Sequence, residues 1–316
     1  MSPKVSILMS IYNETEEQIR ESVESILSQT LADFEFIIVN DNPNRKEIKT
    51  LLDSYNDSRI RFIQNEKNIG LAMCMNKAAS NSSADILARM DADDIAIPNR
   101  LEKEYPYVSA DGYDFVFSRY ILIDEFSKET NGFIKEYLPE DTLSKNPLVI
   151  PGRIHHPTVI FTRSIFEKVG GYRDFPCSQD LDLWNRMLAA GCRFIMLNDQ
   201  LLKYRINPNS VSNKKWHQQQ LTCDYINELF LERLKNGKDS YSKEDYQRFL
   251  VDNGCFNEIA ENKLKDAYAL LVTSKKYRLS GNLLLSIFYK MLAIMRSKVL
   301  LKRTICRIRL KMVRVL

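Results

Sequence analysis

The stretch Phe34-Glu35-Phe36-Ile37-Ile38-Val39-Asn40-Asp41 indicates the fold class of this chain. It is a nearly continuous apolar run that closes on an acidic residue. Such runs are typical of strands covered on both faces, as in a parallel sheet. A second run, Ile86-Leu87-Ala88-Arg89-Met90, leads directly into Asp91-Ala92-Asp93-Asp94. Both runs therefore predict buried strands that end in carboxylates.

Helical patterns separate the strand-like runs of the first 100 residues. Residues 5–9 are a further short apolar run, and another strand is expected over residues 60–64. Thr15 and Gln18 have the spacing of a capping box, in front of apolar residues that recur at helical intervals. Helices are also expected over residues 46–55 and 70–80. This alternation predicts an open α/β sheet with right-handed crossovers.

The last third of the chain has a different pattern. Residues 105–215 mix strand-like and helical stretches, and from Trp216 onward the pattern is helical to the end. A chain of 316 residues suits two domains at about 150 residues per domain. We therefore predict an α/β domain over residues 1–215 and a helical C-terminal region over residues 216–316.

The composition excludes several classes of protein. Hydrophobic residues make up 44% and charged residues 27%, as in folded proteins and unlike disordered ones. The six cysteines show neither C-x-x-C nor zinc-binding spacing, so scattered thiols in a reducing cytosol are expected. The first apolar run, of about five residues, is too short for a signal peptide. A cytoplasmic protein is predicted.

Charge is unevenly distributed along the chain. Residues 275–316 hold 12 Lys and Arg and no Asp or Glu. The residues before them hold 33 Lys and Arg against 41 Asp and Glu, a balance of −8. An acidic body with a basic tail indicates that the tail meets an anionic partner.

The tail, residues 283–316, has the pattern of a basic amphipathic helix that lies in a membrane interface. Basic residues interrupt it too often for a transmembrane span. The alternative is a helix that packs on the body or on another subunit. Nucleic-acid binding is not predicted, because Phe288 and Tyr289 precede the basic run rather than interleave with it. The apolar positions are Leu284, Ile287, Met291, Ile294, Leu301, Ile305, Ile308 and Met312, and the recurring arginines are Arg296, Arg303, Arg307 and Arg314.

The acidic residues lie where an open α/β sheet binds ligands, beyond the carboxyl ends of its strands. Asp41 ends one strand-like run, and Asp91 and Asp93 follow another. No Gly-rich phosphate loop occurs in the chain. Closely spaced carboxylates can instead hold Mg²⁺ or Mn²⁺, which bridge a diphosphate. Solvated turn carboxylates are the alternative for Asp91 and Asp93.

At these positions the sequence resembles glycosyltransferase family 2, whose members have the GT-A fold. The resemblance covers roughly residues 4–213 and is greatest to bacterial enzymes that build capsule, exopolysaccharide or O-antigen. The matching motifs are Val5-Ser6-Ile7-Leu8-Met9-Ser10-Ile11-Tyr12-Asn13, Gln29-Thr30-Leu31, the stretch 34–41, Asn68-Ile69-Gly70-Leu71, the stretch 89–94, Pro98-Asn99-Arg100-Leu101, His156-Pro157-Thr158, Val169-Gly170-Gly171-Tyr172, Gln179-Asp180-Leu181-Asp182-Leu183-Trp184 and Tyr204-Arg205.

The resemblance implies a role for each of five residues. Tyr12 would stack on the uracil of a UDP-sugar, and Asp41 would accept the imide N–H of that base. Asp93 would bind the metal directly, with Asp91 near the ribose and the metal. Asp180 would be the catalytic base. Without the resemblance, Tyr12 is also compatible with a core aromatic, and Asp180 is better explained as a helix N-cap.

The sequence departs from the family pattern at several positions. An Arg is common where Met75 stands, so Arg89 is expected to serve the phosphates, with a surface or structural Arg89 as the alternative. Asn207 stands where a His often completes the metal shell, which places more weight on the acids, the diphosphate and water. Gln179 replaces a frequent Glu, which weakens any orienting role there. His155 and His156 are compatible with either the acceptor mouth or a structural role.

Together these features predict an inverting, metal-dependent hexosyltransferase at the inner face of the cell membrane. Mg²⁺ or Mn²⁺ would be its cofactor, a UDP-sugar its donor and a saccharide on a polyprenyl diphosphate its acceptor. The signature Q-x-x-R-W of processive synthases is absent, so one sugar per binding event is expected. The alternatives are a nucleotidyltransferase, disfavoured by the missing phosphate loop, and a non-catalytic module that binds nucleotide sugars.

Overall fold

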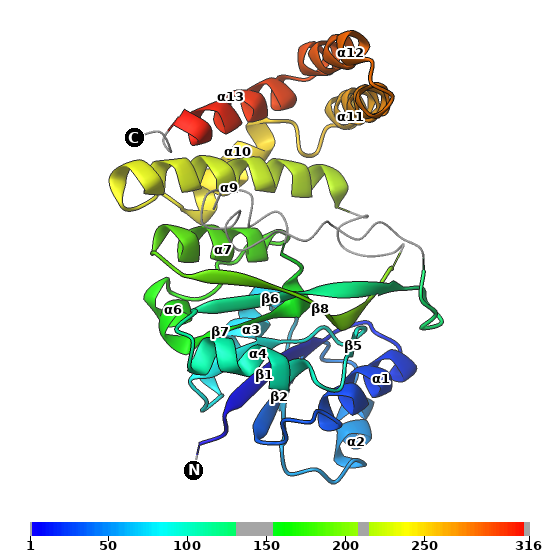
Figure 1. Ribbon diagram of the computed structural model, residues 1–316, viewed down its shortest axis with the longest axis vertical. Coiled ribbons are helices and arrows are strands. Elements are labelled where there is room, and N and C mark those ends of the chain that lie inside the picture. The colour runs from blue at the N-terminus through cyan, green and yellow to red at the C-terminus, as the bar shows by residue number, and fades with distance from the viewer. Residues whose placement is uncertain (1, 131–153, 208–214, 313–316) are drawn as a thin grey trace. The chain divides into compact units, whose positions relative to one another are not determined.

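The computed structural model describes residues 2–130, 154–207 and 215–312 (Figure 1). The chain divides into two compact units, Met1–Pro208 and Asn209–Leu316. The first unit holds a mixed sheet with its helices. Over residues 215–312 the second unit contains helices and no strand. The predicted α/β domain and helical C-terminal region are both present.

The sheet of the first unit has eight strands in the order β3-β2-β1-β4-β7-β6-β8-β5. Strands β1, β2, β3 and β4 are mutually parallel, as predicted. Strand β7 runs antiparallel to both β4 and β6, so the sheet is mixed beyond β4. The bounds are β1 Val5–Ile11, β2 Phe34–Asn40, β3 Ile60–Gln64, β4 Ile86–Arg89, β5 Ile95–Ala96, β6 Phe115–Ile123, β7 Val159–Thr162 and β8 Phe194–Arg205.

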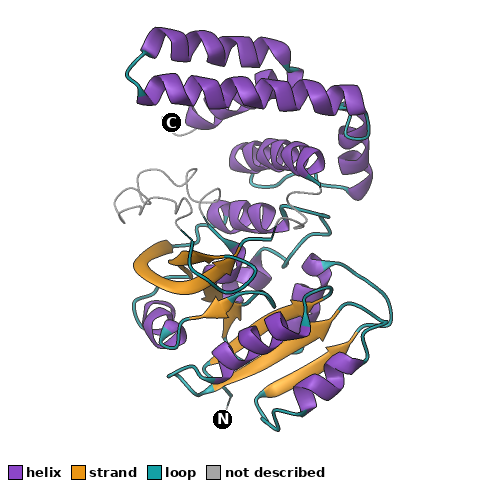
Figure 2. Cartoon of the chain, turned by 90° about the vertical axis from the view of Figure 1, so that its right-hand side faces the viewer, coloured by secondary structure: helices purple, strands orange, loops and turns teal. Residues whose placement is uncertain are grey.

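Helices cover the sheet of the first unit (Figure 2). The side chain of Thr15 accepts a hydrogen bond from the backbone N–H of Gln18, and the side chain of Gln18 accepts one from that of Thr15, which confirms the capping box. The helices are α1 Glu16–Leu27, α2 Glu47–Asp53, α3 Leu71–Ser80, α4 Arg100–Ser109, η3 His156–Thr158, α6 Arg163–Lys168 and α7 Gln179–Ala189.

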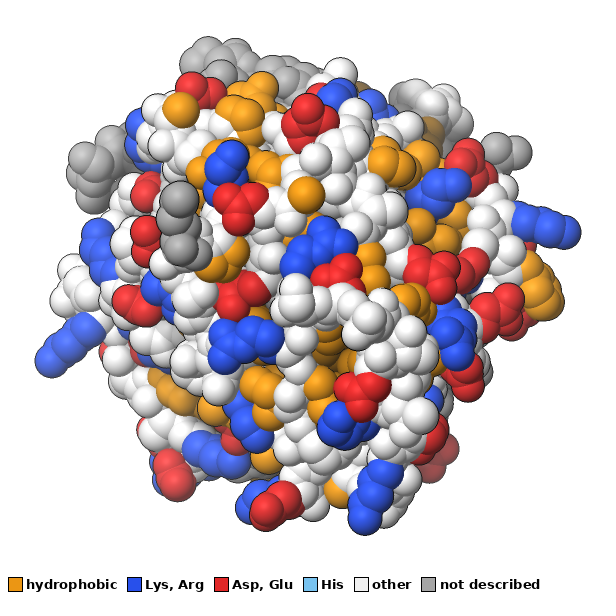
Figure 3. Space-filling model, turned by 90° about the horizontal axis from the view of Figure 1, so that it is seen from below, with side chains coloured by type: hydrophobic (Ala, Val, Ile, Leu, Met, Phe, Trp, Pro, Cys, Tyr) orange, Lys and Arg blue, Asp and Glu red, His pale blue; other side chains and the backbone are white. Residues whose placement is uncertain are grey.

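Strand β2 is buried on both faces because its side chains alternate between two apolar clusters. Phe36 and Ile38 belong to one cluster, which includes residues of α1 and α2. Ile37 and Val39 belong to the other, which includes residues of α3 and α7. This double burial is the physical reason for the continuous apolar run of β2. On the face seen in Figure 3, acidic and basic side chains are interspersed.

The second unit contains α9 (Trp216–Asn236), α10 (Lys243–Asp252), α11 (Glu258–Leu279), α12 (Leu283–Arg296) and α13 (Lys298–Met312). The tail therefore forms two helices where its pattern predicted one. Ser297 separates them with an extended backbone, and its hydroxyl accepts a hydrogen bond from Leu300 N at 3.4 Å. Arg314 lies outside the described residues. None of the helices described is long and apolar enough to span a bilayer.

Candidate active site

The carboxyl ends of three adjacent parallel strands carry the predicted donor-binding residues. Tyr12 directly follows β1, Asp41 directly follows β2, and Asp91 lies two residues beyond the end of β4. Because β1 lies between β2 and β4 and is parallel to both, these residues meet at one edge of the sheet. Tyr12 is 42% exposed, so the alternative of a core aromatic is wrong.

Three carboxylates interact electrostatically at this edge. Burial raises the pKa of Asp93 to about 7, with further contributions from the charges of Asp91 and Glu14. The pKa of Glu14 is raised as well, first by burial and also by the charge of Asp91. Such a cluster of like charges favours a bound cation. Sequence reasoning missed Glu14, although it follows Tyr12 by two residues at the same strand end.

Arg205, at the end of β8, holds the turn that carries Asp93. Its Nε donates to the backbone oxygen of Asp93 at 2.7 Å, and its backbone N–H donates to Oδ1 of Asp94 at 2.8 Å. Its Nη2 binds Oε2 of Glu21 on α1 at 2.6 Å. Burial raises the pKa of Asp94 well above its usual range, and the charges of Asp93 and Asp91 add to the effect. The turn is therefore anchored to both β8 and α1.

Arg89 lies beneath the acidic turn and not on the surface. Its side chain is 1% exposed and pairs with Oδ1 of Asp91. Its Nη1 also lies 3.5 Å from the backbone oxygen of Leu8 on β1. This burial favours the structural alternative over a direct contact with phosphates. Arg89 then orients Asp91 and offsets part of the negative charge.

Asp41 joins the end of β2 to the beginning of α3. Its Oδ1 accepts hydrogen bonds from Asn65 Nδ2 at 2.8 Å and from Ile69 N at 2.9 Å, and its Oδ2 accepts one from Gly70 N at 2.8 Å. Gly70 has φ of +81°, a conformation that favours glycine. Asp41 is 3% exposed, so any contact with a base would add to these structural hydrogen bonds.

The two acids of helix α7 have different surroundings. Asp180 lies in the first turn, and Ser178 occupies the N-cap position, so the alternative that Asp180 is the N-cap is wrong. Asp182 is buried and pairs with Arg186, whose Nε lies 2.9 Å from Oδ2, and with Arg173, whose Nη1 lies 3.3 Å from Oδ1. Both carboxylate oxygens of Asp182 therefore form structural ion pairs.

Tyr172 connects Asp180 electrostatically to the acidic turn. Burial is the main cause that raises the pKa of its phenol, and the charges of Asp180 and Asp91 both contribute. Its hydroxyl lies 2.7 Å from Nε2 of His156. Burial, with the nearby charge of Arg89, lowers the pKa of His156 well below its usual range, which favours its structural role. The candidate base thus lies within electrostatic reach of the same buried tyrosine as Asp91.

The donor atoms suit a divalent cation that is shared with a ligand. Within residues 2–130, 154–207 and 215–312, no three acidic, His or Cys side chains converge as a complete metal site. Mg²⁺ is often held by one or two carboxylates together with the phosphates of a substrate. Asp91 and Asp93, with their unfavourable mutual charge, fit this partial type of site.

Much of the chain is similar in sequence to known proteins. The model of the family described as Glycosyl transferase family 2 matches residues 6–170. An uncharacterized glycosyltransferase of Methanocaldococcus jannaschii is 39% identical over 213 residues, which are 66% of this chain and 72% of that protein. The O-antigen biosynthesis glycosyltransferase WbnJ of Escherichia coli is 34% identical over 213 residues, 65% of this chain and 81% of that protein.

One further relative has a name that states its acceptor, and one solved structure has a similar fold. An Escherichia coli protein named UDP-Gal:alpha-D-GlcNAc-diphosphoundecaprenol beta-1,3-galactosyltransferase is 28% identical over 218 residues, 67% of this chain and 78% of that protein. The crystal structure of S. aureus TarS superposes with a TM-score of 0.60 at 16% identity, over 92% of this chain. The superposition covers 54% of the TarS chain, and it shows the fold alone.

Proposed function

The chain belongs to glycosyltransferase family 2, and from this premise we propose that it transfers single sugars from a UDP-sugar to a lipid-linked saccharide during synthesis of a bacterial surface polysaccharide. The observation that carries this proposal is the carboxylate cluster of Glu14, Asp91 and Asp93 beside the exposed ring of Tyr12. Such an edge combines an aromatic surface for a base with acids that suit a cation and a diphosphate.

Donor binding is assigned to the residues after β1 and β2. Tyr12 stacks on the uracil, because its ring is exposed at the strand end. Asp41 accepts the imide N–H of the base while it also fixes the start of α3. Asp91 binds the ribose and shares the cation, and Arg89 orients Asp91 from below.

Asp93 and Asp91 would hold Mg²⁺ or Mn²⁺ together with the donor diphosphate and water. When bound, the cation neutralises the charge that develops on the leaving nucleoside diphosphate. The protein contributes the fixed turn: Arg205 holds the backbone of Asp93, so the carboxylates are positioned before the donor arrives.

Asp180 is proposed as the general base. It removes the proton of the acceptor hydroxyl as that oxygen attacks the anomeric carbon. The bond from the anomeric carbon to the diphosphate breaks in the same displacement, so the anomeric configuration inverts. Asp182 is unsuited to this role because Arg186 and Arg173 bind its carboxylate.

The acceptor is proposed to be a saccharide on a polyprenyl diphosphate. Two similar Escherichia coli proteins carry names that state transfer to GlcNAc-diphosphoundecaprenol, one from UDP-Gal and one from UDP-Glc. Such an acceptor has its diphosphate at the membrane surface. We therefore place the enzyme at the inner face of the cell membrane, with its basic tail toward anionic lipid.

The test is release of UDP from a panel of nucleotide sugars, with UDP-Gal and UDP-Glc first, in the presence of a diphosphate-lipid-linked saccharide. Acceptor-dependent UDP release is expected, and NMR of the product should show the inverted anomer. Release of pyrophosphate in a separate reaction that contains UTP and a sugar 1-phosphate would instead indicate a nucleotidyltransferase. Donor binding without turnover on any sugar would indicate a non-catalytic module. A retained anomer would reject the single displacement.

A further inference from the structure

Helix α12 leaves a row of large apolar side chains uncovered. The exposed fractions are 83% for Leu284, 56% for Ile287, 57% for Phe288, 59% for Met291 and 81% for Met295. At 3.6 residues per turn, these five positions fall within a sector of about 100° on one side of the helix. We call them the apolar face of α12. Exposed apolar clusters of this kind usually mark an interaction site.

The opposite side of α12 packs on α11, which fixes the direction of the apolar face. Ser286 and Ala293 are buried there, and the hydroxyl of Ser274 donates to the backbone oxygen of Ser286 at 2.7 Å. The rings of Tyr277 and Tyr289 stack with their centroids 5.4 Å apart. Figures 1 and 2 show α11 and α12 side by side as a hairpin. The apolar face therefore points away from α11.

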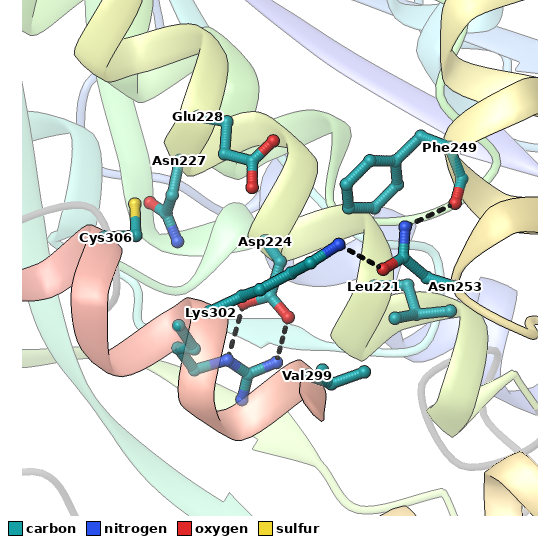
Figure 4. Close-up of a pocket in the computed structure, with 10 residues that line it drawn as sticks. Leu221, Asp224, Asn227, Glu228, Phe249, Asn253, Val299, Lys302 and Cys306 are labelled. Atoms are coloured by element: carbon teal, nitrogen blue, oxygen red, sulfur yellow. Dashed lines mark hydrogen bonds and ion pairs between the residues drawn. The ribbon is translucent and has the colours of Figure 1, made fainter. Parts of the chain in front are cut away.

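Helix α13 is held inside the second unit in a different way. Nε and Nη2 of Arg303 bind the two carboxylate oxygens of Asp224 on α9, at 2.5 and 2.9 Å. Nζ of Lys302 donates to Oδ1 of Asn253 at 3.0 Å (Figure 4). Arg303 is thus a structural residue, and its charge is already compensated. Polar contacts therefore tie α13 to the rest of the second unit, although Leu301, Ile305 and Ile308 stay 47%, 42% and 52% exposed. The apolar face of α12 is larger and more exposed than that of α13.

The basic residues of α12 favour an anionic bilayer over a second copy of the chain as the partner of the apolar face. Lys290 and Arg296 are exposed and lie about 110° and 130° around α12 from the centre of this face, between it and the side packed on α11. No acidic residue occurs from Lys275 onward. A second copy of the chain, docked face to face, would bring the same cations together. An anionic bilayer offers apolar chains below a negative surface, which complements both features.

We infer that the apolar face of α12 inserts into the surface of an anionic phospholipid bilayer, with Lys290 and Arg296 at the level of the headgroups. This inference rests on the proposed function, whose acceptor lies in the membrane. It assigns bilayer contact to residues 284–296, whereas α13 serves to hold the second unit together. The long basic side chains can extend toward the headgroups while the apolar side chains enter the acyl boundary.

The test compares the variant F288S/M291S with the control variant F256S/I259S in the full chain. Phe256 and Ile259 are 74% and 68% exposed but lie outside the apolar face. Binding is measured by sedimentation with phosphatidylcholine vesicles that contain phosphatidylglycerol. Loss of two inserted side chains should weaken binding about tenfold or more. The control should bind like the parent chain. Equal binding of all three proteins would overturn the inference.

The variants F288W and F256W test whether the side chain at position 288 enters the acyl region of the bilayer. Lipids brominated in their acyl chains should quench the added tryptophan at position 288 and leave that at position 256 unquenched. No additional quenching at position 288 relative to the parent chain would overturn the inference, even if the protein sediments with vesicles.

Two further measurements separate this inference from its alternatives. If the parent chain is a dimer without lipid and F288S/M291S is a monomer, a second copy covers the face, and the inference is wrong. UDP release with a short-chain, water-soluble acceptor should be equal in the parent chain and F288S/M291S. If no protein releases UDP with any donor, the proposed function fails, while the vesicle experiments still decide the role of α12.

Discussion

The Nε of Arg205 donates a hydrogen bond to the backbone oxygen of Asp93 at 2.7 Å. The two residues are 112 positions apart, and they meet because β8 ends beside the turn that follows β4. The side chain of Arg205 is 1% exposed and also binds Glu21. Arg205 therefore positions the acidic turn from behind without being placed to touch a ligand.

Replacing Arg205 with Lys should loosen this turn. Lysine keeps the charge but lacks the planar fork that binds Asp93 and Glu21 at once. We expect the affinity for Mn²⁺ in the presence of UDP to fall about tenfold, the scale for residues that orient metal ligands. Calorimetry measures this affinity. The matched control is R248K, because Arg248 is 70% exposed. Unchanged Mn²⁺ affinity in R205K would show that Arg205 serves stability alone.

Removal of the cation should abolish transfer. Burial and the charges of Asp91 and Glu14 raise the pKa of Asp93, which shows that the three carboxylates repel one another when all are ionised. A bound cation would relieve this repulsion. Excess EDTA and the variant D93A should both eliminate UDP release, and Mg²⁺ or Mn²⁺ should restore it to the parent chain only. The control is D199A, which changes a half-exposed acid of β8. Full activity of the parent chain in EDTA would contradict the assignment.

Asp41 should affect both donor binding and stability. The variant D41A leaves three donors without their acceptor, namely Asn65 Nδ2, Ile69 N and Gly70 N. Each unsatisfied buried donor costs about 1 to 3 kcal/mol, so a lower melting temperature is expected. UDP affinity should fall as well. Calorimetry on the folded variant separates the two effects, because unchanged UDP affinity would leave Asp41 with a structural role only.

Asp180 and Asp182 should respond differently to the same substitution. D180N should keep its fold and UDP affinity and lose about a hundredfold or more in turnover, the scale of general-base catalysis. D182N should lose stability instead, because Arg186 and Arg173 lose an ionised partner. Turnover numbers and melting temperatures of both variants provide the comparison. Near-normal turnover of D180N would exclude it as the base.

The acid stability of the first unit should depend on Glu35. Burial opposes ionisation, but hydrogen bonds from Ser6 and Ser83 and the contact with Arg61 outweigh it and lower the pKa to about 2. A lowered pKa stabilises the fold above the unfolded value of 4.5, and this contribution disappears as the pH falls toward 2. Urea unfolding between pH 7 and 2 measures this. The free energy of unfolding should fall less steeply with decreasing pH in E35Q than in the parent chain.

Much of the site follows from local sequence. The apolar run of β2 and the acids after β4 predicted buried parallel strands with carboxylates at one edge, and the structure has this arrangement. The spacing of Thr15 and Gln18 predicted the start of α1. These features depend on strand periodicity and on hydrogen bonds between residues a few positions apart, so short stretches of sequence contain the information.

Partnerships between distant residues were decided by the tertiary structure alone. Arg205 reaches Asp93, Glu14 joins the acidic cluster, and Arg89 is buried under Asp91. In the tail, the amphipathic pattern predicted one helix, but the chain turns at Ser297 and Arg303 pairs with Asp224. Periodicity in the sequence predicts which side of a helix is apolar. Which part of that side is covered, and which residue pairs with each charge, depends on packing between elements that are far apart in the sequence.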